Sequence, residues 1–226
     1  MTAAEFQAGT TRILYDADRL TTLSLEWLQP NFWRLRGAVL AELGGRGQAL
    51  AVGTEAGEAV LRPYLRGGWM ARINRDRYFF NGYKRSRPFR EWRLLARLHA
   101  AGLPVPRPLM AGCDRSGLAY RGALLTQRIP HALPLDRLLA VLTEPDWREL
   151  AVTLNRFFGA GLVHPDLNPG NVLRDESGDW YLIDLDRARL RKGPVSPKPM
   201  IARLERALQR SSSYPPGLLP GLVSAS

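Results

Sequence analysis

The sequence contains one cysteine, Cys113, so no disulfide can form within the chain, which fits a reducing cytoplasm. It has no run of eighteen apolar residues, and we therefore expect no membrane-spanning helix. Residues 1–11 lack the basic and then apolar layout of a secretory signal. These absences exclude a disulfide-stabilised secreted domain and argue against a protein held in a membrane by its own helix.

Acidic residues are also in short supply. The 226 residues include 32 Lys and Arg, overwhelmingly arginine, against 21 Asp and Glu, which gives a net charge of +11. A chain this basic is expected to meet an anionic partner such as nucleic acid, an acidic membrane surface or a phosphorylated substrate. Hydrophobic residues make up 45% of the chain, enough for one large domain or two small lobes.

One stretch carries a recognisable chemical pattern. His164, Asp166, Leu167 and Asn171 follow the spacing H-x-D-L-x-x-x-N, and Asp184 ends a short apolar run thirteen residues beyond Asn171. A turn-rich surface loop explains the composition but not the spacing to Asp184. This spacing is typical of the catalytic loop and metal-binding aspartate of the protein-kinase fold.

The pattern gives each polar residue a predicted role in phosphoryl transfer. Asp166 would orient the attacking hydroxyl or accept its proton, and Asn171 and Asp184 would bind Mg²⁺. His164 is expected to hold the loop by hydrogen bonds rather than to act as a base. Asp186 is either a further metal ligand or a solvated carboxylate, and the second reading is slightly favoured.

A glycine-containing turn is expected before residue 52. Gly45, Gly47 and Val52 match G-x-G-x-x-x-x-V, the turn that covers the phosphates of ATP in kinases, although Leu50 stands where a third glycine is usual. Glycines let backbone amides approach phosphate closely. A plain hairpin turn explains this motif at least as well.

The next strand and the following helix are predicted to supply an ion pair. Residues 58–62 alternate like a strand and end at Arg62, where a kinase has its phosphate-contacting lysine. Residues 89–101 read as a helix, and Glu91 lies on the same face as its leucines, so this carboxylate needs a cation. Arg62 is the expected partner of Glu91. The alternatives are an exposed arginine at a strand end, a Glu91 paired with another arginine, and phosphate contact through Lys84.

A hinge is expected between two lobes. Residues 123–126 read as a buried strand, and residues 127–131 lead out of it. Backbone groups from Gln127 to Ile129 would bind the adenine of ATP. A long helix over residues 146–159 then delivers the chain into the catalytic loop.

The predicted fold class is α+β, a protein-kinase-like bilobal fold. Residues 1–126 would form an N-lobe built on an antiparallel sheet, and residues 132–210 a short, mainly helical C-lobe. Residues 211–226 are rich in Pro, Gly and Ser and are expected to be a flexible tail. The C-lobe has no Ala-Pro-Glu segment and no room for peptide-binding helices, which argues against a protein substrate.

Residues 62–93 combine ten Lys or Arg with eight aromatic residues. Such a mixture suits a nucleic-acid groove or a membrane interface, where aromatic rings sit at headgroup level. A solvated arginine-rich face is a third reading, which the many aromatic residues disfavour.

Longer runs of sequence add a family resemblance. The chain resembles the bacterial 3-deoxy-D-manno-octulosonic acid (Kdo) kinases, which belong with the lipopolysaccharide core heptose kinases in the protein-kinase superfamily. The resemblance covers about residues 32–210. It rests on Leu61-Arg-Pro-Tyr-Leu-Arg-Gly-Gly68, Asp76-Arg-Tyr-Phe-Phe80, Arg87-Pro-Phe-Arg-Glu91, Gly102-Leu-Pro-Val-Pro106 and His164-Pro-Asp-Leu-Asn-Pro-Gly-Asn171.

The resemblance implies ATP-dependent phosphorylation of the 4-hydroxyl of Kdo on a lipid A precursor, Kdo-lipid IVA, with Asp166 at the catalytic position. It also implies peripheral attachment to the cytoplasmic face of the inner membrane. The anionic glycolipid and the anionic membrane surface would then be the partners of the basic chain, and nucleic acid would not. The alternatives are a kinase for heptose or another small sugar, and a non-enzymatic nucleic-acid-binding module. The oligomeric state stays open.

Overall fold

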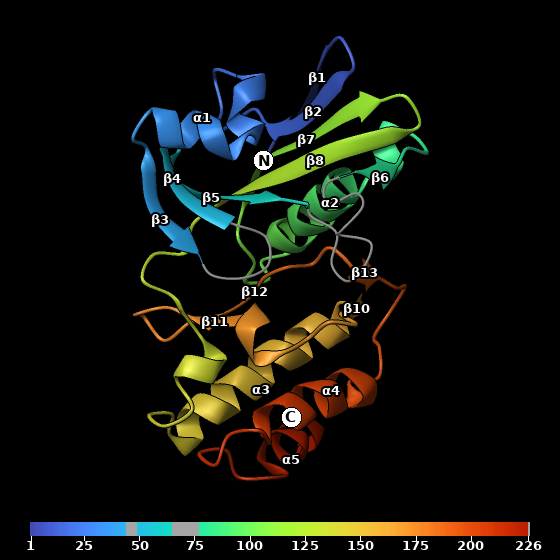
Figure 1. The fold of residues 1–226 in the computed structure, drawn as a ribbon. Helices are drawn as coiled ribbons and strands as arrows, with labels where there is room; N and C mark the ends of the chain where they lie inside the picture. Colours follow the sequence, from blue (N-terminus) through green and yellow to red (C-terminus); the bar gives the residue numbers. More distant parts are fainter. Residues whose placement is uncertain (44–48, 65–76, 226) are drawn as a thin grey trace. The chain divides into compact units, whose positions relative to one another are not determined.

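The computed structural model describes residues 1–43, 49–64 and 77–225. The chain forms two compact units (Figure 1). Residues 1–100 and 107–128 make up the first unit, and residues 101–106 and 129–226 the second. The chain therefore enters the second unit at residue 129, within the expected hinge 127–131. Residues 101–106, expected in the N-lobe, belong to the second unit.

The first unit is built on an eight-stranded antiparallel sheet. Seven strands follow the order β1-β2-β7-β8-β5-β4-β3, and β6 pairs with β8. The strands are β1 (Ala3–Ala8), β2 (Thr11–Asp16), β3 (Val39–Leu43), β4 (Ala49–Thr54), β5 (Gly57–Pro63), β6 (Tyr78–Phe79), β7 (Pro108–Ser116) and β8 (Ala119–Gln127). The antiparallel sheet expected for this part of the chain is confirmed.

Helical segments cover both faces of this sheet (Figure 1). On one face lie the 3₁₀ helix η1 (Leu25–Leu28) and α1 (Pro30–Leu35), whose Trp33 joins a core with Ile13 and Leu61. On the other lies α2 (Arg87–Ala100), preceded by the 3₁₀ helix η3 (Tyr83–Arg85). Strand side chains alternate between the two faces, so Arg62, next to the core residue Leu61, points toward α2.

Two glycines let the helical segments approach the sheet closely. A Cβ on Gly112 of β7 would lie 2.0 Å from Leu28 Cδ1, and one on Gly122 of β8 would lie 2.7 Å from Pro88 Cγ. Neither contact is possible for a real side chain. Gly112 thus admits η1 on one face, and Gly122 admits the start of α2 on the other.

The second unit is mainly helical, and its strands are short. It contains β9 (Leu133–Pro134), η4 (Leu135–Arg137), α3 (Glu144–Gly159), β10 (Leu162–Val163), η5 (Pro169–Asn171), β11 (Val172–Arg174), β12 (Trp180–Leu182), β13 (Arg189–Leu190), α4 (Lys198–Leu208) and α5 (Leu218–Ala225). Helix α3 begins with a capping box between Thr143 and Asp146 and buries Leu150, Leu154 and Phe157. This is the long helix expected over 146–159, with two further residues at its start.

The flexible tail expected over 211–226 is wrong for its second half, because residues 218–225 form α5. The Asn155 side chain on α3 donates to the Val223 carbonyl at 3.0 Å, and the buried Glu205 on α4 accepts the Gly217 N–H at 2.7 Å and the Tyr214 hydroxyl. Composition predicted disorder, but a buried carboxylate and a few apolar side chains are enough to hold this segment on α3 and α4.

Candidate active site

The catalytic loop begins at a backbone position that requires glycine. Gly161 follows α3 with φ +87°, and a Cβ there would lie 2.4 Å from the Arg191 carbonyl oxygen. Strand β10 then pairs with β13 through Leu162 and Leu190. The end of α3 and this short ladder fix where the loop starts.

His164 lies inside the second unit and is 1% exposed. The backbone N–H of His164 donates to Met200 Sδ at 3.2 Å, and the ring Nε2 lies 3.4 Å from the Ile183 carbonyl oxygen. Burial lowers the pKa of His164, so the ring is neutral at pH 7 and Nε2–H donates to Ile183. These contacts agree with a structural role in holding the loop.

Asp166 carries its carboxylate between two arginines. Arg187 Nη1 lies 3.2 Å from one carboxylate oxygen, and Arg203 Nη2 lies 3.1 Å from the other. The Asp166 side chain is 31% exposed, whereas those of Arg187 and Arg203 are 69% and 47% exposed. The candidate catalytic group is therefore accessible to solvent and fully ion-paired.

Two asparagines fix the backbone of Asp166. The Nδ2 atoms of Asn168 and Asn171 donate to the Asp166 carbonyl at 2.7 and 3.1 Å, and Asn168 Oδ1 accepts the Gly170 N–H at 3.0 Å. Asn168 is thus used to hold the loop. Because Asn171 donates through Nδ2, its Oδ1 is left to act as a metal ligand.

Asp184 is brought to Asn171 by a hairpin. Val172 of β11 pairs with Leu182 of β12, and the Ile183 N–H donates to the Asn171 carbonyl at 3.0 Å. Asp184 is the next residue. Its φ of +54° lies in the left-handed region, which costs an ordinary residue about 1–2 kcal/mol and which Asp and Asn tolerate best.

The donor set around Asn171 and Asp184 suits magnesium. In the described ranges, no three His, Cys, Asp or Glu side chains cluster in a way that could hold a metal ion. Mg²⁺ is commonly held by one or two protein oxygens together with substrate phosphates and water. One amide oxygen and one carboxylate on a single hairpin fit that requirement.

The first unit contains the predicted ion pair. Arg62 Nη2 contacts Glu91 Oε2, and the same oxygen accepts the hydroxyl of Tyr64. The Glu91 side chain is 1% exposed and that of Arg62 is 25% exposed. Burial, together with the charge of Glu91, raises the pKa of Tyr64, which therefore stays a neutral donor. The pairing of Arg62 with Glu91 is confirmed, and the exposed strand-end alternative is excluded.

Comparison with known proteins decides the family. The model of the lipopolysaccharide kinase (Kdo/WaaP) family matches residues 30–214. The chain belongs to this family.

Individual relatives agree with that assignment. The chain is 41% identical to a 3-deoxy-D-manno-octulosonic acid kinase of Stenotrophomonas maltophilia over 203 residues, which covers 89% of this chain and 79% of the relative. It is 42% identical to proteins of the same name from Xanthomonas oryzae (81% of this chain, 74% of the relative) and Xylella fastidiosa (79% and 72%). The chain is therefore a kinase of lipopolysaccharide biosynthesis, and the predicted kinase-like α+β fold is confirmed.

Some predicted site residues of this lipopolysaccharide kinase stay predictions. Gly45 and Gly47 lie outside the described residues. Val52 is fully buried in β4 and belongs to the core of the first unit. Its contact with a nucleotide stays a prediction.

At the predicted hinge, two backbone donors are already used within the first unit. The Gln127 N–H donates to the Arg107 carbonyl at 2.8 Å, and the Arg128 N–H donates to the Glu58 carbonyl at 2.9 Å. Binding of adenine by the Gln127 N–H would require this first bond to break. Ile129 remains the simpler candidate for that contact.

Sequence reasoning missed three residues that contact the predicted site carboxylates. Tyr64 follows Arg62 by two positions, the spacing that keeps strand residues on one face, so this contact was open to prediction. Arg187 and Arg203 lie 21 and 37 residues from Asp166 in sequence. Among so many arginines, no local pattern distinguishes these two.

Proposed function

We propose that this kinase transfers the γ-phosphoryl group of ATP to the 4-hydroxyl of the Kdo residue on a lipid A precursor, Kdo-lipid IVA. The observation that carries the proposal is the joined arrangement of Asp166, Asn171 and Asp184 on one loop and hairpin. The printed names of the relatives, which are Kdo kinases, support the choice of acceptor.

Each residue has its own role in the phosphoryl transfer. Asp166 orients the acceptor hydroxyl and takes its proton while the hydroxyl oxygen bonds to the γ-phosphorus and the bond to the ADP oxygen breaks. Asn171 and Asp184 hold Mg²⁺, which supplies positive charge to the β- and γ-phosphates when bound. Arg62 binds the α- and β-phosphates and is held in position by Glu91 and Tyr64. Because Arg62 is paired with Glu91, we favour it over Lys84 for this contact.

The test is a phosphorylation assay with magnesium and ATP on purified Kdo-lipid IVA, compared with heptosylated acceptors. We expect phosphate at the 4-position of Kdo, and no product when magnesium is chelated. Preferential phosphorylation of heptose would overturn the choice of acceptor. No phosphoryl transfer to any of these glycolipids would overturn the proposed function.

We also propose that the first unit docks on the anionic cytoplasmic face of the inner membrane. No helix in the described part of the chain is long and apolar enough to cross a bilayer, so attachment would rest on a surface. At one end of the sheet, Phe79 and Leu118 are 68% and 75% exposed, and the Phe80 N–H donates to the Leu118 carbonyl at 2.9 Å. We call these two exposed residues, with the exposed basic residues Arg77, Lys84, Arg85 and Arg115, the sheet-end surface.

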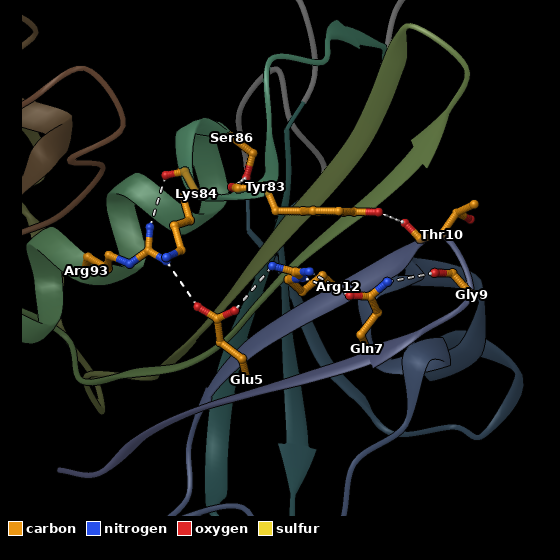
Figure 2. A network of polar contacts seen from close by, with 9 residues as sticks. All are labelled: Glu5, Gln7, Gly9, Thr10, Arg12, Tyr83, Lys84, Ser86 and Arg93. Carbon is orange, nitrogen blue, oxygen red and sulfur yellow. Dashed lines mark hydrogen bonds and ion pairs between the residues drawn. The ribbon is translucent and has the colours of Figure 1, made fainter.

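Figure 2 shows how part of this surface is anchored. The Tyr83 hydroxyl donates to the Thr10 carbonyl at 2.8 Å, in the turn between β1 and β2, and Arg93 donates to the Lys84 carbonyl at 3.0 Å. The aromatic rings behind it pack on one another or on arginines, as Phe80 does with Tyr83 at 4.9 Å between ring centroids. Rings packed in this way are not available to stack on bases, which favours a membrane over nucleic acid.

Flotation with vesicles tests the membrane proposal. Each basic residue near an anionic bilayer contributes about 1 kcal/mol, so we expect binding to vesicles that contain phosphatidylglycerol and release as salt rises. Replacing both Phe79 and Leu118 with serine should weaken flotation. The control is Leu35→Ser, because Leu35 is 88% exposed on α1 and outside the sheet-end surface. Binding that ignores salt and lipid charge would contradict the proposal.

A further inference from the structure

The contact of Asp166 with two arginines is not explained by the reaction described above. Asp166, Arg187 and Arg203 come from three segments of the second unit: the catalytic loop, the turn after Asp184, and α4. Each arginine meets a different oxygen of the carboxylate, at 3.2 and 3.1 Å. Two cations are thus gathered around the group that has to meet the acceptor.

Stability of the fold does not account for this arrangement. Exposed ion pairs contribute about 0–1 kcal/mol, and both arginines are largely exposed. Helix α4 is held in the second unit by other means, since Met200, Ile201, Leu204 and Leu208 are buried. The pairs can therefore be exchanged for other partners at little cost to folding.

The chemistry of Asp166 favours such an exchange. Each oxygen of Asp166 already accepts a hydrogen bond from a guanidinium, so the hydroxyl of the acceptor has to compete with two charged donors for this carboxylate. A neutral hydroxyl brings no charge with which to draw the two arginines away. An anionic group on the same acceptor molecule does bring that charge, and arginine binds carboxylates and phosphates through two parallel hydrogen bonds.

We propose that Arg187 and Arg203 form an oxyanion-binding subsite for the acceptor. They bind a carboxylate or phosphate of the acceptor molecule and, in moving to it, release Asp166 to orient the hydroxyl. Specificity for an acidic acceptor then comes from the same two residues that hold Asp166 in the absence of acceptor. This inference rests on the proposed function for the identity of the acceptor.

The test compares Arg187→Gln and Arg203→Gln with the wild type in steady-state phosphorylation of Kdo-lipid IVA. Hydrogen bonds between charged groups predict an increase of about tenfold to a hundredfold in the KM for the acceptor. The KM for ATP should stay within about twofold. Arg203→Lys should recover part of the loss, because it keeps the charge but not the paired hydrogen bonds.

Arg206→Gln is the matched control. Arg206 lies three residues further along α4, is exposed, and carries the same charge. Its replacement should leave the KM for the acceptor unchanged. Equal effects at Arg203 and Arg206, or an unchanged acceptor KM in both Arg187→Gln and Arg203→Gln, would overturn the subsite.

Modified acceptors identify which anion is bound. One acceptor carries the Kdo carboxylate as its methyl ester, and a second lacks the lipid phosphates. With the acceptor that lacks the bound anion, wild type and Arg203→Gln should give similar KM values, whereas with the other acceptor the difference between them should persist. A difference that persists undiminished with both modified acceptors would show that neither group is bound there, and the subsite would be rejected.

Binding of free Kdo, measured by calorimetry, separates this inference from the proposed function. If the wild type phosphorylates no Kdo acceptor but binds the free sugar acid, and Arg203→Gln loses that binding, then the function fails and the subsite stands. If the wild type phosphorylates Kdo-lipid IVA and Arg187→Gln and Arg203→Gln match it, the function stands and the subsite fails. Thermal unfolding checks that each variant is folded.

Discussion

The two units pair carboxylates with arginines in opposite surroundings. In the first unit Glu91 is 1% exposed and meets Arg62 and a buried tyrosine hydroxyl. In the second unit Asp166 is 31% exposed and meets two arginines that are themselves largely in solvent. The partners are chemically the same, and the difference lies in the access of water.

The access of water determines how readily each ion pair opens. Breaking a buried pair leaves a charge without solvent, so such a pair stays closed and fixes the position of its members. An exposed pair loses little when it opens, because water replaces the partner. The Arg62–Glu91 pair is therefore suited to positioning, and the contacts of Asp166 are suited to exchange.

Asp166→Asn tests the exposed side of the comparison. We expect phosphoryl transfer to fall by about 10²–10⁴-fold, the usual contribution of a positioned acid–base group. The midpoint of thermal unfolding should hardly change, since the ion pairs of Asp166 are exposed. Asp136→Asn is the control, an exposed carboxylate of the same unit outside the loop. Substantial remaining transfer in Asp166→Asn would remove Asp166 from its assigned role.

Arg62→Met tests the buried side. The change removes the Arg62 guanidinium from the buried Glu91 carboxylate, and we expect a loss of about 3–5 kcal/mol in the free energy of unfolding, measured by urea denaturation. The variant Arg62→Met, Tyr64→Phe, Glu91→Leu, which also removes the buried hydroxyl that Glu91 accepts, should recover most of that stability but no activity. A single variant as stable as the wild type would mean that the pair does not fix the positions of α2 and β5.

These two outcomes bear on how much the sequence could predict. The Arg62–Glu91 pair was predictable because both residues lie in regular elements, where strand alternation and helix periodicity determine which face a side chain occupies. The spacing of Asp166, Asn171 and Asp184 predicted that these residues lie together on one loop and hairpin, while their catalytic and metal-binding roles stay predictions. Local rules therefore gave the α+β class, the main elements and these positions.

Contacts between segments distant in sequence were not predictable in this way. Arg203 contacts Asp166 because of the way α4 packs in the second unit, and no pattern in residues 198–208 predicts that packing. The helix at 218–225 was missed for the same reason, since its stability comes from Glu205 and Asn155 rather than from its own composition. Tertiary packing overrode the local signal.

A further prediction concerns the left-handed backbone conformation of Asp184. Because Asp184 has a left-handed backbone, Asp184→Asn should keep the stability of the wild type, and Asp184→Ala should lose about 1 kcal/mol more. Magnesium-dependent turnover should be lost in both variants. Equal unfolding free energies for the two would contradict a backbone contribution at this position.

A smaller effect is expected from the buried imidazole of His164. Its pKa is lowered by burial, so between that value and about 6.5 the unfolded chain binds a proton that the folded chain does not. Stability should thus be complete above about pH 6.5 and should fall as the pH drops below it. His164→Gln should show less of this decline, as followed by urea denaturation from pH 7.5 to 5. His131→Gln, at a histidine whose side chain is 71% exposed, should behave as the wild type.

The hydrogen bond from the Ile183 N–H to the Asn171 carbonyl joins the catalytic loop to the segment that ends in Asp184. One backbone amide thus links the two candidate magnesium-binding residues, Asn171 and Asp184. Its exchange with deuterated solvent reports directly on whether this hydrogen bond is formed. In a labelled sample, the single resonance of Ile183 can follow the integrity of the site under any condition, without substrate and without turnover.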